Sequence, residues 1–423
     1  MQLVQINRTM IKLEDIYKAK VKLQGVAMHT PLMINENLSE QYGADIMLKR
    51  EDLQPVRSYK LRGAYNKISS LSGDEMTRGV VCASAGNHAQ GVAYACKKLN
   101  IKATIFMPLT TPKQKVSKVR LFGKDKVEVI LKGDTFDESF EHASKYCEEH
   151  NEIFIHPFDG DEIIAGQGTV GLEIMEDSTR SVDYLFVPIG GGGLAAGVST
   201  VFKQLSPQTK IIGVEPEGAA SMKTSIENGV NTPLEDIDKF IDGAAVKRVS
   251  DSTFEICKEN LTDIVLVPEG KVCTTILRLY NEDAIVVEPA GALTIAALDF
   301  YSDKIKGKNV VCIISGGNND ITRTEEIKER SLLYEGLKHY FLINLSQRPG
   351  ALKEFVNEIL GPEDDITYFQ YTKKNNREAG PAVVGIELNN KNDLGSLEDR
   401  LQSHKIKYQH LNSHNDLFTH LIS

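Results

Sequence analysis

Tryptophan is absent from this chain of 423 residues, cysteine is scarce, and long apolar runs are missing. The six cysteines are never close enough to form a CxxC pair, which argues against a zinc knuckle or a dithiol redox motif: Cys82, Cys96, Cys147, Cys257, Cys273 and Cys312. No apolar run approaches the ~18 residues that a membrane span requires. The first twenty residues mix charges throughout and lack a signal-peptide core. Free thiols in such a chain predict a reducing, cytoplasmic location.

Basic residues are also too few to suggest a polyanionic partner. The chain has 49 Lys and Arg against 58 Asp and Glu, for a net charge of −9. This balance argues against binding to nucleic acid or to an anionic membrane, although a local site can still hold one small anion. The ten histidines form no HExxH pattern, so we expect no metal site.

What the sequence does contain, from about residue 45 to 320, is an alternation of strand-like and helix-like segments. Eight short β-branched runs stand out as strands: ADIMLKRE, GVVCASA, KATIFMP, KVEVILKG, YLFVPIG, KIIGVEP, DIVLVPEG and NVVCIISGG. Amphipathic helical stretches lie between them. The alternation predicts an α/β fold with parallel sheet and helices on both faces.

The pattern changes after Asn319. A charged helical stretch leads into a β-α-β-β-α-β order over about 85 residues, which is typical of a ferredoxin-like α+β domain. We therefore divide the chain into residues 1–325, a linker at 326–337, and a separate domain at 338–423.

Lys60 is the first of four features that suggest chemistry. It stands in Ser58-Tyr59-Lys60-Leu61-Arg62-Gly63-Ala64, where an extended stretch gives way to a helical one. The positive end of the helix dipole lowers the pKa of a lysine there and favours the neutral amine that Schiff-base chemistry needs. Most lysines are solvated surface groups, so the heptapeptide alone leaves both interpretations open.

Two turns of small polar residues follow apolar strands. The first holds Ser84, Ala85, Asn87 and His88, and the second holds Ser315 within Ile313-Ile314-Ser315-Gly316-Gly317-Asn318-Asn319. Such turns present backbone N–H groups and short side chains at the carboxyl end of a strand, where ligands bind in open α/β sheets. Each turn, taken alone, is equally well explained as a helix cap.

Four consecutive glycines stand between a predicted strand and a predicted helix, at Gly190-Gly191-Gly192-Gly193-Leu194. Such a loop can point several N–H groups at one oxygen-rich anion, and a phosphate is the natural guest. The loop also fits the dinucleotide fingerprint as Gly191-x-Gly193-x-x-Ala196, with Glu215 placed to bind a ribose. A nicotinamide-dependent oxidoreductase is therefore an alternative.

Together the four features describe a pyridoxal phosphate site, and here the sequence resembles a known family. The motifs SYKLRGA, SAGNHAQG, GGGGL, EPAGA and SGGN are similar to those of the fold type II pyridoxal phosphate enzymes, the tryptophan synthase β group. Within that group they resemble the threonine dehydratases, over roughly residues 5–320. The resemblance implies two open α/β lobes, with a small lobe at roughly 55–160 inserted in the large one. RPGALKEF resembles an ACT-like regulatory domain, as in the shorter biosynthetic form of these enzymes.

The resemblance also implies roles for individual residues. Lys60 would hold the cofactor and act as the base at the substrate Cα. The cofactor phosphate would lie on Gly190, Gly191, Gly192, Gly193 and Leu194. Asn87 would bind the phenolic oxygen, Tyr59 and Gly243 would cover the ring faces, and Ser315 would meet the pyridine nitrogen. Ser84, Ala85, Asn87 and His88 would surround the substrate carboxylate.

The activity implied by the resemblance is β-elimination of water from L-threonine, giving 2-oxobutanoate and ammonia, as the first step of isoleucine biosynthesis. An L-serine dehydratase or related lyase is one alternative, and a catalytically inactive amino-acid sensor is another. Serine racemases of the family carry a serine where this chain has Ala85, which argues against racemisation. Relatives bind a cation at a Glu-x-x-x-Ala-x-Asp pattern, but Ser221 replaces the aspartate here, so we predict no divalent metal and leave a weakly bound monovalent cation as the alternative.

For the C-terminal domain the resemblance implies regulation. The turn with Arg348, Pro349 and Gly350 would offer N–H groups to an amino-acid effector, with isoleucine expected and a homotetramer as the assembly. A role in assembly alone is the alternative. The spacing of Leu352, Phe355 and Ile359 predicts that these three side chains belong to the domain core.

Overall fold

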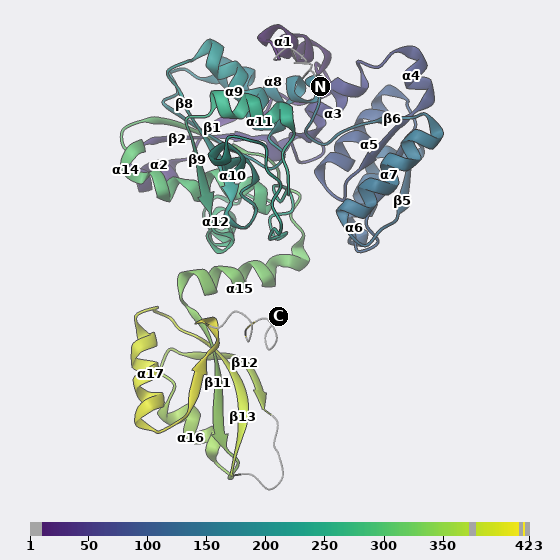
Figure 1. Ribbon diagram of the computed structural model, residues 1–423. Helices are drawn as coiled ribbons and strands as arrows, with labels where there is room; N and C mark the ends of the chain where they lie inside the picture. The colour runs from purple at the N-terminus through teal and green to yellow at the C-terminus, as the bar shows by residue number, and fades with distance from the viewer. Residues whose placement is uncertain (1–10, 372–377, 414–417, 419–423) are drawn as a thin grey trace. The chain divides into compact units, whose positions relative to one another are not determined.

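The computed structural model describes residues 11–371, 378–413 and 418, and the chain divides into two compact units, residues 1–320 and 321–423 (Figure 1). The first ten residues, part of the stretch used above to argue against a signal peptide, lie outside the described residues. None of the described helices is long and apolar enough to cross a membrane.

The large lobe of the first unit is built on a six-stranded sheet in the order β1-β2-β10-β7-β8-β9. Its strands are β1 (Leu32–Ile34), β2 (Asp45–Arg50), β7 (Tyr184–Pro188), β8 (Lys210–Pro216), β9 (Asp263–Val267) and β10 (Asn309–Ile314). β1 pairs antiparallel with β2, and the other neighbours are parallel.

Helices cover both faces of this sheet because successive strand residues point to opposite sides. In β7, Leu185 and Val187 enter the core formed with α8 (Asp161–Asp177) and α9 (Gly193–Leu205). Phe186 points the other way, and its ring centroid lies 5.3 Å from that of Tyr301. The remaining large-lobe helices are α1 (Leu13–Lys22), α2 (Glu36–Tyr42), α10 (Ser221–Asn228), α11 (Asp251–Asn260), α12 (Glu269–Asp283), α13 (Pro289–Ala296) and α14 (Ser302–Ile305), with 3-10 turns η1 (Glu51–Leu53), η3 (Glu217–Ala219) and η4 (Ala297–Tyr301).

The small lobe has its own parallel sheet, in the order β5-β4-β3-β6. Its elements are α3 (Lys60–Ile68), α4 (Gly73–Arg78), β3 (Val80–Ala83), α5 (Asn87–Leu99), β4 (Ala103–Met107), α6 (Lys113–Gly123), η2 (Lys124–Lys126), β5 (Val127–Leu131), α7 (Phe136–His150) and β6 (Ile153–Phe154). Val80 and Cys82 face α5, whereas Val81 and Ala83 face α7, so this sheet is also covered on both sides. The predicted α/β fold is confirmed; β1 and β6 were missed because each has only two or three residues.

The second unit has the predicted ferredoxin-like order. An antiparallel sheet β12-β13-β11-β14 packs against two helices, and its elements are β11 (Lys338–Ser346), α16 (Ala351–Glu358), β12 (Asp365–Tyr371), β13 (Ala379–Glu387), α17 (Asp393–Ser403), β14 (Tyr408–His410) and η6 (Leu411–Ser413). Phe355 and Ile359 lie in its core as predicted, but the prediction for Leu352 was wrong, since its side chain is 44% exposed. Leu352 begins the exposed side of α16, one residue after the buried Ala351.

The stretch predicted as a linker, residues 326–337, is mostly helical. η5 (Ile321–Arg323) and α15 (Thr324–Glu335) precede β11, and both belong to the second unit. Tyr340 Oη of β11 donates a hydrogen bond to Glu329 Oε1 of α15 at 2.5 Å, and Leu333 packs beside Tyr340. α15 therefore covers the sheet of its own unit.

Candidate active site

A cavity of about 500 Å³ opens where the carboxyl ends of β3, β7 and β10 meet, and both lobes of the first unit line it. Ten of the predicted site residues are among those that line it: Tyr59, Lys60, Ser84, Ala85, Asn87, His88, Gly190, Gly191, Gly243 and Ser315. Gly192, Gly193 and Leu194 are not among the lining residues; Gly192 is the N-cap of α9 and Gly193 its first residue. Motifs separated by more than 250 residues in the sequence thus gather at one site.

Lys60 is the first residue of α3, and its side chain points into the cavity. Its Nζ donates a hydrogen bond to the carbonyl oxygen of Pro157 at 2.8 Å, and lies 5.3 Å from the centre of the Tyr59 ring. Burial lowers the pKa of Lys60 to about 8, although the charge of Glu288 opposes this shift. A substantial fraction of the amine is therefore neutral near physiological pH, which is the form that attacks a carbonyl.

The glycine loop passes very close to neighbouring chain segments. A Cβ on Gly191 would lie 2.1 Å from the ring of Phe158, and one on Gly193 would lie 2.6 Å from the Phe158 carbonyl oxygen. Gly192 has φ +89°, a conformation that side chains disfavour. The loop leads into α9, whose first N–H groups have no acceptor within the helix and favour an anion.

The turn after β3 contributes backbone rather than charge. His88 is buried, and its Nε2 lies 2.8 Å from the carbonyl oxygen of Ile155. Burial, assisted by the positive charge of Lys60, lowers the pKa of His88 to about 3, so the imidazole is neutral. Ser84 Oγ accepts a hydrogen bond from the N–H of Gly86 at 3.2 Å, which fixes the turn.

On the large-lobe side, Ser315 and Gly243 close the cavity. Ser315 is 3% exposed, and its carbonyl oxygen accepts a hydrogen bond from Tyr59 N at 3.2 Å, so the end of β10 fixes the residue before Lys60. A Cβ on Gly243 would lie 2.8 Å from Cβ of Ala290, which leaves no room for a side chain there.

Glu288, whose role the sequence left open, also lines the cavity. Its Oε1 accepts a hydrogen bond from Asn87 Nδ2 at 2.6 Å. Burial raises the pKa of Glu288 to about 7, so its carboxyl is partly protonated near neutral pH. The EPAGA motif was the available signal for this residue.

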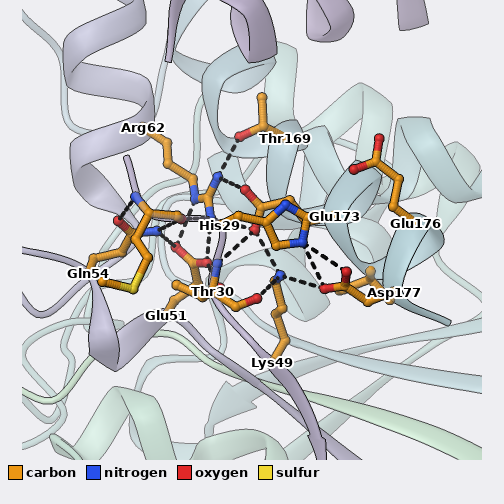
Figure 2. A network of polar contacts seen from close by, with 12 residues as sticks. His29, Thr30, Lys49, Glu51, Gln54, Arg62, Thr169, Glu173, Glu176 and Asp177 are labelled. Atoms are coloured by element: carbon orange, nitrogen blue, oxygen red, sulfur yellow. Dashed lines mark hydrogen bonds and ion pairs between the residues drawn. The ribbon is translucent and has the colours of Figure 1, made fainter. Parts of the chain in front are cut away.

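Sequence reasoning missed a buried ionic cluster centred on Arg62, two residues after Lys60 (Figure 2). The guanidinium of Arg62, 1% exposed, contacts two carboxylates: Nη2 lies 2.7 Å from Glu51 Oε1, and Nη1 lies 2.6 Å from Glu173 Oε1. Nη1 also donates to Thr169 Oγ1 at 3.2 Å, and Nη2 to the Met28 carbonyl oxygen at 3.1 Å. Arg62 thereby joins α3 to η1 and α8, which fixes the helix that carries Lys60.

Lys49 extends this cluster from β2. Its Nζ is fully buried, lies 2.8 Å from Glu173 Oε2, and donates to the Thr30 carbonyl oxygen at 2.5 Å. Burial alone would raise the pKa of Glu173, but the charges of Arg62 and Lys49 outweigh it and hold that pKa below its usual value. The two cations thus keep Glu173 ionised inside the protein.

The dinucleotide alternative fails at Glu215. Both of its carboxylate oxygens accept backbone hydrogen bonds, from Met222 N at 2.7 Å and from Lys223 N at 2.8 Å. The side chain is fully buried and holds the start of α10, so it is not presented to a ribose. In the part of the chain that the structure describes, no three His, Cys, Asp or Glu side chains gather as a metal site, and the absence of a metal stays a prediction.

Comparison with known proteins settles the family. Residues 24–316 match the family described as pyridoxal-phosphate dependent enzyme, and residues 329–422 match the C-terminal regulatory domain of threonine dehydratase. The chain is 60% identical over 412 residues to the biosynthetic L-threonine dehydratase IlvA of Halalkalibacterium halodurans, across 97% of this chain and 99% of the relative. The chain belongs to the threonine dehydratase family of pyridoxal-phosphate dependent enzymes. This membership contradicts the oxidoreductase alternative.

The chain is also similar to three further proteins, at identities from 56% down to 34%. The enzyme of the same name from Bacillus subtilis is 56% identical over 414 residues, which is 98% of each chain. The solved structure of a processed threonine deaminase isoform from Solanum lycopersicum has a TM-score of 0.71 at 43% identity, covering 76% of this chain and 94% of its own. A serine racemase from Dictyostelium discoideum has a TM-score of 0.68 at 34% identity, covering 74% and 99%. The predicted family and cofactor class are confirmed.

The residues present fit pyridoxal phosphate. Lys60 supplies an amine with a lowered pKa, and the glycine loop at the start of α9 supplies backbone donors that a larger side chain would displace. Gln90, buried in the cavity wall, has an Oε1 without a hydrogen-bond partner among the described residues, so a polar ligand has an acceptor to meet. When bound, this cofactor withdraws electrons from the bonds at the substrate Cα.

The lowered pKa of Lys60 predicts its reactivity in the cofactor-free protein. We expect acetylation of Lys60 by trace acetic anhydride to rise with a midpoint near pH 8, because only the neutral amine reacts. An ordinary lysine has a pKa of about 10.4, so its acetylation would rise only at higher pH. Peptide mass spectrometry over a pH series measures the acetylation of Lys60. A midpoint for Lys60 near pH 10 would contradict the burial argument.

The ionic cluster predicts a large cost for removing its central cation. Arg62→Gln leaves Glu51 and Glu173 buried without their partner, and we expect the free energy of unfolding to fall by about 3–5 kcal/mol. Lys67→Gln is the matched control, since Lys67 also joins α3 to α8 but does so in a partly exposed pair with Glu162 at 3.1 Å. That pair contributes less than about 1 kcal/mol. Equal losses in urea unfolding of the two variants would refute the central role of Arg62.

Proposed function

We propose that this chain is a threonine ammonia-lyase, which converts L-threonine to 2-oxobutanoate and ammonia by β-elimination of water. The observation that carries the proposal is Lys60, with its lowered pKa, at the head of α3 in the cavity between the lobes. The names of the relatives at 60% and 56% identity support the choice of substrate.

The charge of the cavity supports an anionic amino-acid substrate. Besides Lys60, five lysine and arginine side chains line it against four acidic ones, although the whole chain has a net charge of −9. The five are Lys115, Lys118, Lys239, Lys247 and Arg248. An amino-acid carboxylate and a phosphate together bring several negative charges, which this lining compensates.

Within this site we assign different roles in the reaction to different residues. The neutral amine of Lys60 accepts the Cα proton, and its hydrogen bond to the Pro157 carbonyl oxygen shows that the resulting ammonium has an acceptor at 2.8 Å. The backbone of the turn with Ser84 and Asn87 orients the substrate carboxylate. A serine hydroxyl, Ser315, in place of a carboxylate does not enforce protonation of a ring nitrogen, which favours rapid loss of the β-hydroxyl over transamination.

Threonine is preferred to serine in this proposal because of an aromatic wall. Phe136, Phe140 and Phe158 line the cavity, and the methyl group that distinguishes threonine from serine can pack there. One methyl group contributes roughly 0.8 kcal/mol when buried, so an L-serine dehydratase is the alternative that a comparison of the two substrates decides.

The direct test is the reaction itself. We expect the purified chain to be yellow, to be bleached by borohydride, and to release 2-oxobutanoate and ammonia from L-threonine. Lys60→Ala should abolish the product, while Lys67→Ala on the same helix should retain it. Product formation by Lys60→Ala would overturn the role of Lys60. A chain without steady ammonia release would instead be the amino-acid sensor.

The second unit supports regulation by an amino acid, and we propose isoleucine as the effector. The turn of Arg348, Pro349 and Gly350 precedes α16, and Gly350 has φ +88° at the N-cap, so the turn aims N–H groups toward an incoming carboxylate. We also propose that the chain assembles as a homotetramer, which rests on the family resemblance. A cytoplasmic location is proposed because the six cysteines are free thiols.

Isoleucine should shift the threonine saturation curve of the intact chain toward higher threonine concentrations. Gly350→Val strains the turn and should remove that shift, because a side chain disfavours φ +88°. Gly395→Ala in α17, where a Cβ meets nothing within 4 Å, is the control that should retain it. Initial rates over a series of threonine concentrations, with and without isoleucine, measure the shift. A curve that isoleucine leaves unchanged in the intact chain would leave the domain with a role in assembly only.

A further inference from the structure

Four polar side chains form a continuous row along the cavity wall. Lys118 Nζ donates to Asn318 Oδ1 at 3.3 Å, Asn318 Nδ2 donates to Asn87 Oδ1 at 2.7 Å, and Asn87 Nδ2 donates to Glu288 Oε1 at 2.6 Å. Lys118 in α6 and Asn87 in α5 belong to the small lobe. Asn318, after β10, and Glu288, before α13, belong to the large lobe. The row therefore alternates between the lobes.

The direction of every hydrogen bond in the row is set from the Asn318 end. A lysine ammonium can only donate, so it meets the oxygen of the Asn318 amide. A backbone carbonyl can only accept, and that of Val56 lies 2.8 Å from Asn318 Nδ2. Both contacts orient the Asn318 amide in the same way, and its Nδ2 can then meet only the oxygen of the Asn87 amide.

Glu288 does not set this direction reliably by itself. Burial raises its pKa to about 7, so near neutral pH its carboxyl is protonated in part of the molecules. A protonated carboxyl can donate as well as accept, and would tolerate either orientation of Asn87. The amide of Asn318 carries no such ambiguity.

We infer that Asn318 is a positioning residue, which holds the Asn87 amide so that Nδ2, and not Oδ1, faces the phenolic oxygen of the cofactor. The inference rests on the proposed function, in which Asn87 meets that oxygen. Asn87 Nδ2 has two hydrogens, of which Glu288 takes one and the other is left for the cofactor. A reversed amide would place two acceptor oxygens against each other.

The test measures cofactor binding and absorbance in Asn318→Ala, Asn87→Ala and the double variant. Loss of one oriented hydrogen bond should weaken pyridoxal phosphate binding about three- to tenfold and alter its visible absorption band. Because Asn318 acts through Asn87, the double variant should bind no more weakly than Asn87→Ala alone. Asn318→Asp, which keeps a partner for Lys118 but cannot donate to Asn87, should behave like Asn318→Ala.

Asn66→Ala is the control, since Asn66 is a buried asparagine of α3 whose Nδ2 donates to the Glu162 carbonyl oxygen at 2.7 Å, outside the cavity lining. We expect it to leave the cofactor band unchanged. Additive effects of Asn318→Ala and Asn87→Ala, or an unchanged band in Asn318→Asp, would overturn the inference while a yellow, active wild type upholds the proposed function. A wild type that binds no pyridoxal phosphate would overturn both.

Discussion

The buried guanidinium of Arg62 constrains how three segments of the first unit pack together. A cation without water is tolerated only where its charge is paired and its N–H groups have acceptors. Glu51 and Glu173 supply the charge, and they come from η1 and α8. Three segments of the chain must therefore meet at one point before Arg62 can be buried. Because Lys60 stands two residues before Arg62 on α3, the packing of these segments also fixes the position of Lys60.

Close helix contact makes the meeting possible. A Cβ on Gly166 of α8 would lie 2.6 Å from the carbonyl oxygen of Arg62, and a Cβ on Gly63 would lie 2.9 Å from that of Ile163. Glycine at both positions lets α3 and α8 approach until the guanidinium reaches Glu173, two turns further along α8. The two glycines and the ion pair thus depend on each other, since a wider spacing between α3 and α8 would separate Arg62 from Glu173.

Much of the fold and part of the site could be predicted from local pattern. Turns after apolar strands share one sheet edge in a parallel fold, so the pattern of strands and turns is enough to place Gly190 and Ser315 together. Ser84 follows β3 of the other sheet, and only the resemblance to a two-lobed family predicted that it joins the same site. The pairing of Arg62 with Glu173 joins residues 111 positions apart, and no local pattern reports such a pair. The exposure of Leu352 was missed for a related reason. Helical spacing identifies the apolar side of a helix, but it does not show which residues at the border of that side are left exposed to solvent.

The chain passes between the lobes twice, and Lys60 lies at both passages. It ends the first passage, from β2 to α3, and its Nζ binds Pro157 in the second, between β6 and α8. Both connections between the lobes therefore hold Lys60, one through the chain itself and the other through the Pro157 carbonyl oxygen.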